Sequence, residues 1–320
     1  MNFPTVSIII PCFNSEKTIN ACLSSLRIQD FESWEAICVD DGSTDRTLFF
    51  LERIARQDSR IKFFSQGNLG AALARSKGIS LAQGEFITFL DSDDTLERNY
   101  LSKMLREFSS DIDIVVTGLN IIYDGKKKVF RPYYKTTLDG ISFLKSVLCG
   151  KYGWELCGKM YRSDLFKTVL YTPKVSISVG EDALHFFQIL TKVNRVTIIE
   201  SSLYNYYQRS SSISKIHSDK LAIETLRAAI YIERLLKREV FYSQILNEID
   251  AMYLLFYSNA TRRTKMGWFN PFVKSVCSEH LSVNALFLIP KIKALYVLFS
   301  FILGILFSKL RVIGRGVINE

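Results

Sequence analysis

The stretch VDDGSTD (residues 39–45) places three carboxylates and a glycine within seven positions, directly after the largely apolar run of residues 34–38. Acidic residues are poor strand formers, so a buried strand is expected to end here. A second acidic stretch, FLDSDD (residues 89–94), follows another apolar run. Each cluster is consistent either with a turn that caps the next helix or with a ligand pocket.

Short β-branched or aromatic runs alternate with helical periodicity over the first 90 residues. This alternation predicts an α/β fold with a mostly parallel sheet and right-handed crossovers. The acidic clusters then fall at the carboxyl ends of the second and fourth strands, the edge at which ligands bind in open α/β sheets. The expected strands are residues 6–10, 34–39, 61–64 and 86–90, and the expected helices are residues 15–29, 44–55 and 70–82.

After residue 111 the pattern is less regular. We expect strands at 112–117, 129–130 and 196–199, helices at 138–148, 163–169 and 181–190, and purely helical structure from about residue 217.

Composition and motifs exclude several classes of protein. Hydrophobic residues make up 48% and charged residues 23% of the 320 residues, which is typical of a globular protein. No GxGxxG follows the first expected strand and no GxxxxGK[ST] occurs, which argues against dinucleotide-binding and P-loop folds. The six cysteines lack paired spacing and the N-terminus has no secretory signal, so we expect a cytoplasmic protein.

The DSDD stretch has the chemistry of a metal site. Asp91 and Asp93 stand two positions apart at a strand end, so their carboxylates point to one side, about 6–7 Å apart at the backbone. Mg²⁺ or Mn²⁺ takes such oxygen ligands and completes its shell with diphosphate oxygens and water. The metal would neutralise the charge that builds on a departing nucleoside diphosphate. The alternative is that DSDD caps a helix starting near Leu96.

Four stretches carry a resemblance to a known family. VSIIIPCFNSEKT, NLGAALARSKGI and GEFITFLDSDD, together with VDDGSTD, occur in the order found in the family 2 glycosyltransferases with the GT-A fold, and the similarity is close over residues 4–120. The resemblance implies transfer of a sugar from a nucleotide-diphosphate donor to an acceptor hydroxyl, with inversion at the anomeric carbon. We therefore predict a GT-A domain over residues 1–215 (nucleotide-sugar half 1–110, acceptor half 111–215) and a helical, membrane-associating extension over 216–320.

The resemblance assigns donor-binding roles by position. Pro11 and Phe13 would line the base pocket, and Asp41 would accept a hydrogen bond from a base N–H such as that of uracil. Asp40 is expected to face the ribose or to stabilise the turn. Asp45 is expected to cap the following helix.

Further donor contacts come from three other segments. Arg75 matches the family's ARN stretch and could meet phosphate or base, but Ser76 stands where the family has asparagine. Asp93 would bind the metal, and Asp91 would bind the ribose and support the metal. Arg209 would bind the diphosphate, the alternatives being a surface loop or an acceptor contact.

Two stretches suggest the catalytic base and the acceptor. Asp182 in SVGEDALHFFQIL matches the catalytic base, which must take the proton of the acceptor hydroxyl, with Glu181 beside it. The alternative is a helix cap, since acidic residues favour first turns. His185 is expected to be a packed histidine. Trp154 could stack on an acceptor sugar or pack in the core.

The C-terminal end is basic and apolar. Nine Lys or Arg and two Glu lie between Thr261 and Glu320, and the net charge of the chain is +9. Lys293 and Lys309 bracket fifteen uncharged residues, about 22 Å of helix, which is short of a membrane span. We expect helices lying in a membrane interface, at the inner face of the cell membrane. A buried helix or a homodimer interface is the alternative, and no nucleic-acid-binding motif accompanies the charge.

The predicted function is therefore a metal-dependent glycosyltransferase of cell-surface polysaccharide synthesis. UDP-sugar is favoured as donor over GDP- or dTDP-sugar, and a lipid-linked or growing saccharide as acceptor. There are two alternatives. One is a sugar nucleotidyltransferase, and the other is a non-catalytic membrane-associated adaptor that has the GT-A fold.

Overall fold

The computed structural model of this chain describes residues 3–123, 126–130, 133–167, 180–208, 218–263, 275–276, 279–291, 293–295 and 297–298. The chain divides into two compact units, a sheet unit and a helical unit. The sheet unit comprises Met1–Phe143, Trp154–Ser176 and His185–Ser210, and the helical unit comprises Leu144–Gly153, Ile177–Leu184 and Ser211–Glu320. The predicted boundary at residue 215 places three short segments of the helical unit in the first domain, namely residues 144–153, 177–184 and 211–215.

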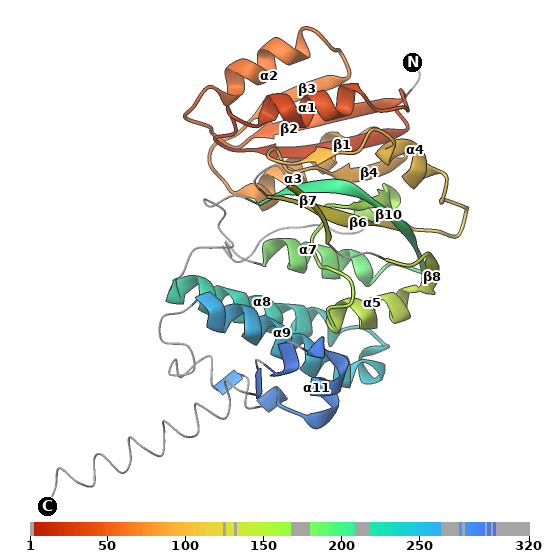
Figure 1. Ribbon diagram of the computed structural model, residues 1–320, viewed down its shortest axis with the longest axis vertical. Coiled ribbons are helices and arrows are strands. Elements are labelled where there is room, and N and C mark those ends of the chain that lie inside the picture. Colours follow the sequence, from red (N-terminus) through yellow and green to blue (C-terminus); the bar gives the residue numbers. More distant parts are fainter. Residues whose placement is uncertain are drawn as a thin grey trace, which may run out of the picture. The chain divides into compact units, whose positions relative to one another are not determined.

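The first four long strands of the sheet unit are parallel, in the order β3-β2-β1-β4 (Figure 1). Alternate residues of β1 pack on opposite faces of the sheet. Val6, Ile8 and Ile10 belong to the core beneath α1 and α2, whereas Ile9 approaches Gly78 of α3. The predicted α/β fold with a largely parallel central sheet is confirmed. The elements are β1 (Val6–Cys12), α1 (Ile19–Arg27), β2 (Trp34–Asp40), α2 (Thr47–Ala55), β3 (Ile61–Ser65), α3 (Ala71–Leu81) and β4 (Phe86–Phe89).

The rest of the sheet is mixed. The order continues β4-β9-β6-β10-β5, with β6 parallel to β10, and β9 antiparallel to both β4 and β6. β7 pairs with β6 and β8 with β10, both antiparallel. These elements are β5 (Thr95–Leu96), α4 (Tyr100–Leu105), β6 (Ile114–Tyr123), β7 (Lys126–Phe130), β8 (Thr136–Asp139), β9 (Lys159–Arg162), α6 (Asp164–Lys167) and β10 (Arg195–Tyr207).

Two sequence predictions in this region were wrong. A helix was expected near Leu96, but residues 95–96 form β5 against β10 and the next helix begins at Tyr100. A helix was also expected from residue 138, but Thr136–Asp139 pairs with β10 as β8, and α5 (Gly140–Leu148) starts only afterwards. In both cases strand pairing with a distant segment determines the local structure, which a local pattern does not reveal.

In the helical unit α8 (Asp219–Leu236) and α9 (Leu246–Arg263) lie side by side (Figure 1). Fully buried residues of α8 such as Leu226 and Ile232, and of α9 such as Leu254 and Leu255, supply its core. The short 3₁₀ helix η2 (Tyr242–Gln244) connects the two, and α11 (Val283–Leu288) packs on α9. α7 (Glu181–Leu190) begins in this unit and ends in the sheet unit.

The membrane prediction for the C-terminal end is tested only in part. Within the described residues, no helix combines the length and apolar character needed to cross a membrane. Residues 299–320, which include Lys309 and most of the predicted interfacial helix, lie outside the described part of the chain.

We predict that Gly84→Ala destabilises the sheet unit. A Cβ at this position would stand 2.6 Å from the backbone nitrogen of Ser7 and 2.9 Å from its Oγ, so β1 or the turn would have to move. We expect the free energy of unfolding, measured by urea denaturation, to fall by about 1–3 kcal/mol. The control is Gly67→Ala, whose Cβ would meet no atom within 4 Å. Equal stability of the two variants would contradict the close approach of Gly84 to β1.

Candidate functional site

Loops from the carboxyl ends of three parallel strands are joined by hydroxyl groups in the sheet unit. Ser15, after β1, shares a hydrogen bond of 2.7 Å with Ser92, after β4. The backbone N–H of Ser15 donates to Oγ1 of Thr47, at the start of α2 after β2 (2.7 Å). The acidic clusters of β2 and β4 therefore share one edge of the sheet, as the sequence predicted. The sequence analysis did not single out these hydroxyl residues, although serine and threonine in such turns are a recognisable signal.

The carboxylate of Asp41 accepts three hydrogen bonds at this edge, and the residue is only 4% exposed. Its Oδ1 accepts from the backbone N–H of Leu69 (2.8 Å) and from the side-chain amide of Gln66 (2.9 Å). Its Oδ2 accepts from the N–H of Gly70 (2.8 Å). Because a carboxylate has about four acceptor positions, roughly one remains for a base N–H. Base binding by Asp41 stays a prediction, and the structure adds a second role, which is to hold the loop of residues 66–70.

The other two aspartates of VDDGSTD support the turn. Asp40 is buried, and its Oδ2 lies 3.4 Å from both the N–H of Ser43 and the hydroxyl of Ser65. Of its two predicted roles, ribose or turn, the turn contacts are the ones observed. Asp45 accepts from the N–H of Thr47 (2.9 Å), the first residue of α2, as a capping residue would, and from the N–H of Glu16 (3.1 Å).

Pro11 lies on β1 and Phe13 in the loop after it, next to the VDDGSTD turn. The N–H of Asp41 donates to the carbonyl of Cys12 (2.8 Å), so Phe13 follows directly on a residue that Asp41 contacts. Phe13 is 47% exposed, which is high for a phenylalanine and leaves its ring accessible, while Pro11 is half-buried. Asn14 adopts a φ of 48°, and its amide oxygen accepts from the N–H of Thr44 (2.9 Å), which ties this loop to VDDGSTD. An accessible aromatic ring here suits the predicted base pocket.

Arg75 connects α3 to the DSDD loop. Its Nη2 donates to Oδ1 of Asp91 at 3.0 Å, and the arginine side chain is 7% exposed while that of Asp91 is 34% exposed. An arginine that is buried but paired at its guanidinium end fixes the position of the carboxylate. Arg75 was predicted to meet phosphate or base, and the contact observed is with Asp91.

Asp94 closes the DSDD loop on β10. It is 1% exposed, and its two oxygens accept from the hydroxyl of Tyr204 (2.7 Å) and the N–H of Tyr207 (2.9 Å). Burial, followed by the charges of Asp91 and Asp93, raises the pKa of Asp94 well above its ordinary value. The alternative prediction, that DSDD caps a helix, is wrong: the residue before α4 is Asn99, and Asp94 binds β10. Tyr204 was missed because its hydroxyl reaches this loop from 110 residues away.

The described residues suit a divalent cation that takes few ligands from the protein and the rest from bound phosphate and water. No group of three His, Cys, Asp or Glu side chains in the described ranges is arranged to hold a metal. Asp91 and Asp93 are both partly exposed at the end of β4, and one oxygen of Asp91 already accepts from Arg75. This donor set fits Mg²⁺ or Mn²⁺, which use one or two protein carboxylates and take their other ligands from phosphate and water.

Asp182 and Glu181 form the first turn of α7 and are partly buried. Gly180, just before them, has a φ of 94°, and a Cβ there would lie 2.7 Å from Cβ of Ala228 on α8, so only glycine fits. This contact lies within the helical unit and positions the predicted base. Trp154 is partly exposed. Arg209 lies outside the described residues.

His185 is a packed histidine, as predicted. It is 2% exposed, and its ring meets the ring of Phe166 edge-on with centroids 6.2 Å apart. Burial, and then the charge of Arg75, lower the pKa of His185 to about 3. The imidazole is therefore neutral at physiological pH and does not serve as a proton donor there.

Comparison with known proteins found a matching family model and similar relatives. Residues 7–169 match the family described as Glycosyl transferase family 2. The Cholesterol galactosyltransferase of Borreliella burgdorferi is 33% identical over 270 residues, covering 79% of this chain and 73% of that protein.

Two solved structures share the fold. TarS (residues 1–349) of S. aureus in complex with UDP-GlcNAc has a TM-score of 0.64 at 20% identity, covering 94% of this chain and 89% of that one. The mannosyltransferase PcManGT of Pyrobaculum calidifontis, in complex with GDP-Man and Mn²⁺, has a TM-score of 0.56 at 16% identity, covering 89% and 78%. At these identities the likeness concerns the fold, which is GT-A.

We predict that Tyr204→Phe destabilises the DSDD loop. The variant removes the O–H donor to the buried carboxylate of Asp94 and the acceptor for the N–H of Asp91 (3.2 Å). We expect the free energy of unfolding in urea to fall by about 1–3 kcal/mol. The matched control is Tyr207→Phe, because Tyr207 binds Asp94 through its backbone and its hydroxyl lies 3.5 Å from Thr95. A similar loss in both variants would contradict a specific role for the Tyr204 hydroxyl.

Proposed function

Because the chain belongs to glycosyl transferase family 2, its activity is the transfer of a sugar, and we propose an inverting reaction from a nucleotide-diphosphate donor to an acceptor hydroxyl. The observation that carries this proposal is the shared sheet edge. There the VDDGSTD turn supplies the hydrogen-bonded carboxylate of Asp41, and the loop after β1 supplies the exposed ring of Phe13. The DSDD loop, joined to α3 by Arg75, supplies two partly exposed carboxylates in the same unit.

We propose that UDP is the nucleotide. The remaining acceptor position of Asp41 suits the N3–H of uracil, with Phe13 and Pro11 beside the base. The complex of TarS with UDP-GlcNAc supports this choice, whereas the complex of PcManGT with GDP-Man keeps a guanine nucleotide as the alternative. Arg209 would contact the diphosphate.

Asp93 and Asp91 would hold Mn²⁺ or Mg²⁺, which when bound neutralises charge on the leaving diphosphate. Arg75 would keep Asp91 oriented. Asp182 would take the proton of the acceptor hydroxyl as the sugar arrives. Glu181 and Trp154 would contact the acceptor.

The acceptor proposed is a lipid-linked or growing saccharide in capsule, O-antigen or exopolysaccharide synthesis. Among the relatives, the cholesterol galactosyltransferase is named for a lipid acceptor. A lipid-linked acceptor suits an enzyme at a membrane surface, which leads to the second part of the proposal.

We further propose that the chain binds the inner face of the cell membrane through the segment around α11. Large apolar side chains are exposed there, among them Val283 (69%), Phe287 (85%) and Leu295 (66%). Lys291, which is also exposed, and Lys293 stand beside them. Apolar side chains flanked by lysines match an interface of anionic headgroups.

The donor site is tested by calorimetric titration of UDP, GDP and dTDP into the protein, first with Mn²⁺ and then with EDTA. We expect UDP to bind and to require the metal, and Asp93→Ala to weaken metal-dependent binding by about tenfold or more. Asp182→Asn is the control, which should keep UDP binding while losing sugar transfer. Absence of any nucleotide binding would overturn the donor site and favour the non-catalytic adaptor. Equal binding in EDTA would overturn the metal role.

Membrane binding is tested by cosedimentation with vesicles of phosphatidylcholine and phosphatidylglycerol, against phosphatidylcholine alone. We expect the chain to bind the anionic vesicles and Phe287→Asp to bind them several-fold more weakly, because a charge enters the apolar face. The control is Val240→Asp, which places the same charge at a side chain that is 99% exposed, outside this segment. Unchanged binding by Phe287→Asp would exclude this segment as the docking face. Loss of a dimer in that variant would support the homodimer alternative.

A further inference from the structure

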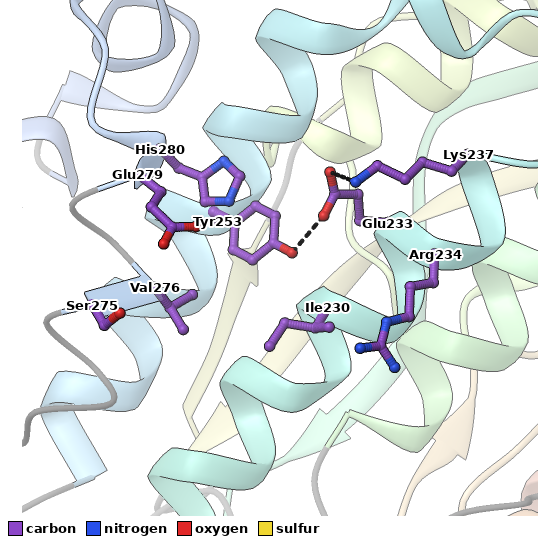
Figure 2. Close-up of a pocket in the computed structure, with 9 residues that line it drawn as sticks. All are labelled: Ile230, Glu233, Arg234, Lys237, Tyr253, Ser275, Val276, Glu279 and His280. Carbon is purple, nitrogen blue, oxygen red and sulfur yellow. Dashed lines mark hydrogen bonds and ion pairs between the residues drawn. The ribbon is translucent and has the colours of Figure 1, made fainter.

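A pocket of about 300 Å³ lies within the helical unit, apart from the residues assigned to the donor and the base (Figure 2). One wall is α8, with Ile230, Arg234 and Lys237. The opposite wall is the segment that carries Val276 and Glu279. Such a volume is at the lower end of the range for small-molecule sites.

The side chains of Tyr253 and His280 at the pocket are held by contacts with each other and with neighbouring carboxylates. The ring of Tyr253 on α9 stacks on the ring of His280, with centroids 3.7 Å apart and planes 5° from parallel. Nδ1 of His280 lies 2.8 Å from Oδ1 of Asp250, and the hydroxyl of Tyr253 donates to Glu233 at 2.9 Å. Side chains that are locked by each other in this way lose little conformational entropy when a ligand binds.

Glu233 is already neutralised inside the pocket. Besides the hydroxyl of Tyr253, it accepts from the hydroxyl of Tyr242 (2.8 Å) and pairs with Lys237 (3.0 Å). Figure 2 shows the Tyr253 and Lys237 contacts as dashed lines. Lys237 and Glu233 therefore contribute a satisfied pair, and neither offers an isolated charge to a ligand.

Arg234 and Glu279 are different. Both are exposed and line the pocket from opposite walls, and within the described residues neither has an ion-pair partner within 4.0 Å. Arg234 lies over the ring of Tyr231 at 5.8 Å, a contact that leaves its N–H donors available. The guanidinium of Arg234 therefore offers hydrogen-bond donors from one wall of the pocket, and the carboxylate of Glu279 offers acceptors from the other. Between them lies an apolar surface formed by Ile230, Val276 and the ring of Tyr253.

These features define the chemistry of the ligand. Two cations (Arg234, Lys237) and two carboxylates (Glu233, Glu279) balance, so the pocket does not select an anion such as phosphate, which Glu279 would repel. A sugar ring has hydroxyl groups that can donate to a carboxylate and accept from a guanidinium, and it has an apolar face that can lie on Ile230 and Val276. We propose that this pocket binds one neutral saccharide unit of the acceptor. This inference rests on the proposed function, since it assumes a saccharide acceptor.

The test is saturation-transfer NMR on the full chain, with galactose and N-acetylglucosamine as probes and with inorganic phosphate as competitor. We expect at least one sugar to receive saturation. Arg234→Ala and Glu279→Gln should each weaken its binding by about tenfold, the loss expected for one hydrogen bond to a charged group. The matched control is Arg227→Ala, which removes an exposed arginine of the same helix outside the pocket and should bind like the wild type.

Three outcomes would overturn the inference. They are the absence of saturation transfer to either sugar, unchanged sugar binding in both pocket variants, and displacement of the sugar by phosphate. UDP titration of the same samples separates this failure from failure of the proposed function, because the donor residues lie in the other unit. If the protein binds UDP with wild-type affinity and Arg234→Ala leaves sugar binding unchanged, the saccharide pocket is rejected and the proposed function is not.

Discussion

The buried carboxylate of Asp94 holds together two parts of the sheet that are far apart in the sequence. It lies at the end of the loop that follows β4, and its oxygens accept hydrogen bonds from the hydroxyl of Tyr204 and the backbone of Tyr207 on β10. Burial and two neighbouring aspartates oppose its ionisation, so its pKa is raised. The hydrogen bonds from β10 act against that effect, and they make the position of the DSDD loop depend on β10. The two accessible carboxylates of the same loop are oriented as a consequence.

The sequence was sufficient for the parallel half of the fold, because β1, β2 and β4 are buried and largely apolar runs and α1 and α2 each have an apolar stripe. It was insufficient for β5, β8 and β9, which are two to four residues long. Such strands form because β10, β4 and β6 offer them free edges, and that pairing is not a local property. The start of α5, which the sequence analysis placed at residue 138, carries a local signal that it did not use. Asp139 accepts from the N–H of Ser142 at 2.9 Å, which is the behaviour of a capping aspartate before a helix.

The candidate site, like the fold, could be predicted from the sequence only in part. The residue types at the strand ends indicated where a ligand would bind, and the shared edge followed from the parallel topology. The sequence could not show how many of those polar groups the chain itself would use. Asp41 binds Leu69, Gly70 and Gln66, and Arg75 binds Asp91, so each has a structural partner before any ligand arrives. Residues with both roles give large effects on mutation, because their loss moves a loop as well as a ligand contact.

The predicted base and the donor carboxylates depend on different parts of the fold. The first turn of α7 is placed by contacts inside the helical unit, where Gly180 approaches Ala228. The segment of residues 144–153 packs in the same unit, where Lys145 pairs with Glu248 (3.5 Å) and Gly150 lies against Leu255. The carboxylates of the DSDD loop, in contrast, are fixed by β10 and α3. We therefore predict that nucleotide binding and proton abstraction are separable by mutation. A change in the packing of α8 should alter the position of Asp182, and with it the turnover, while leaving the affinity for the nucleotide intact.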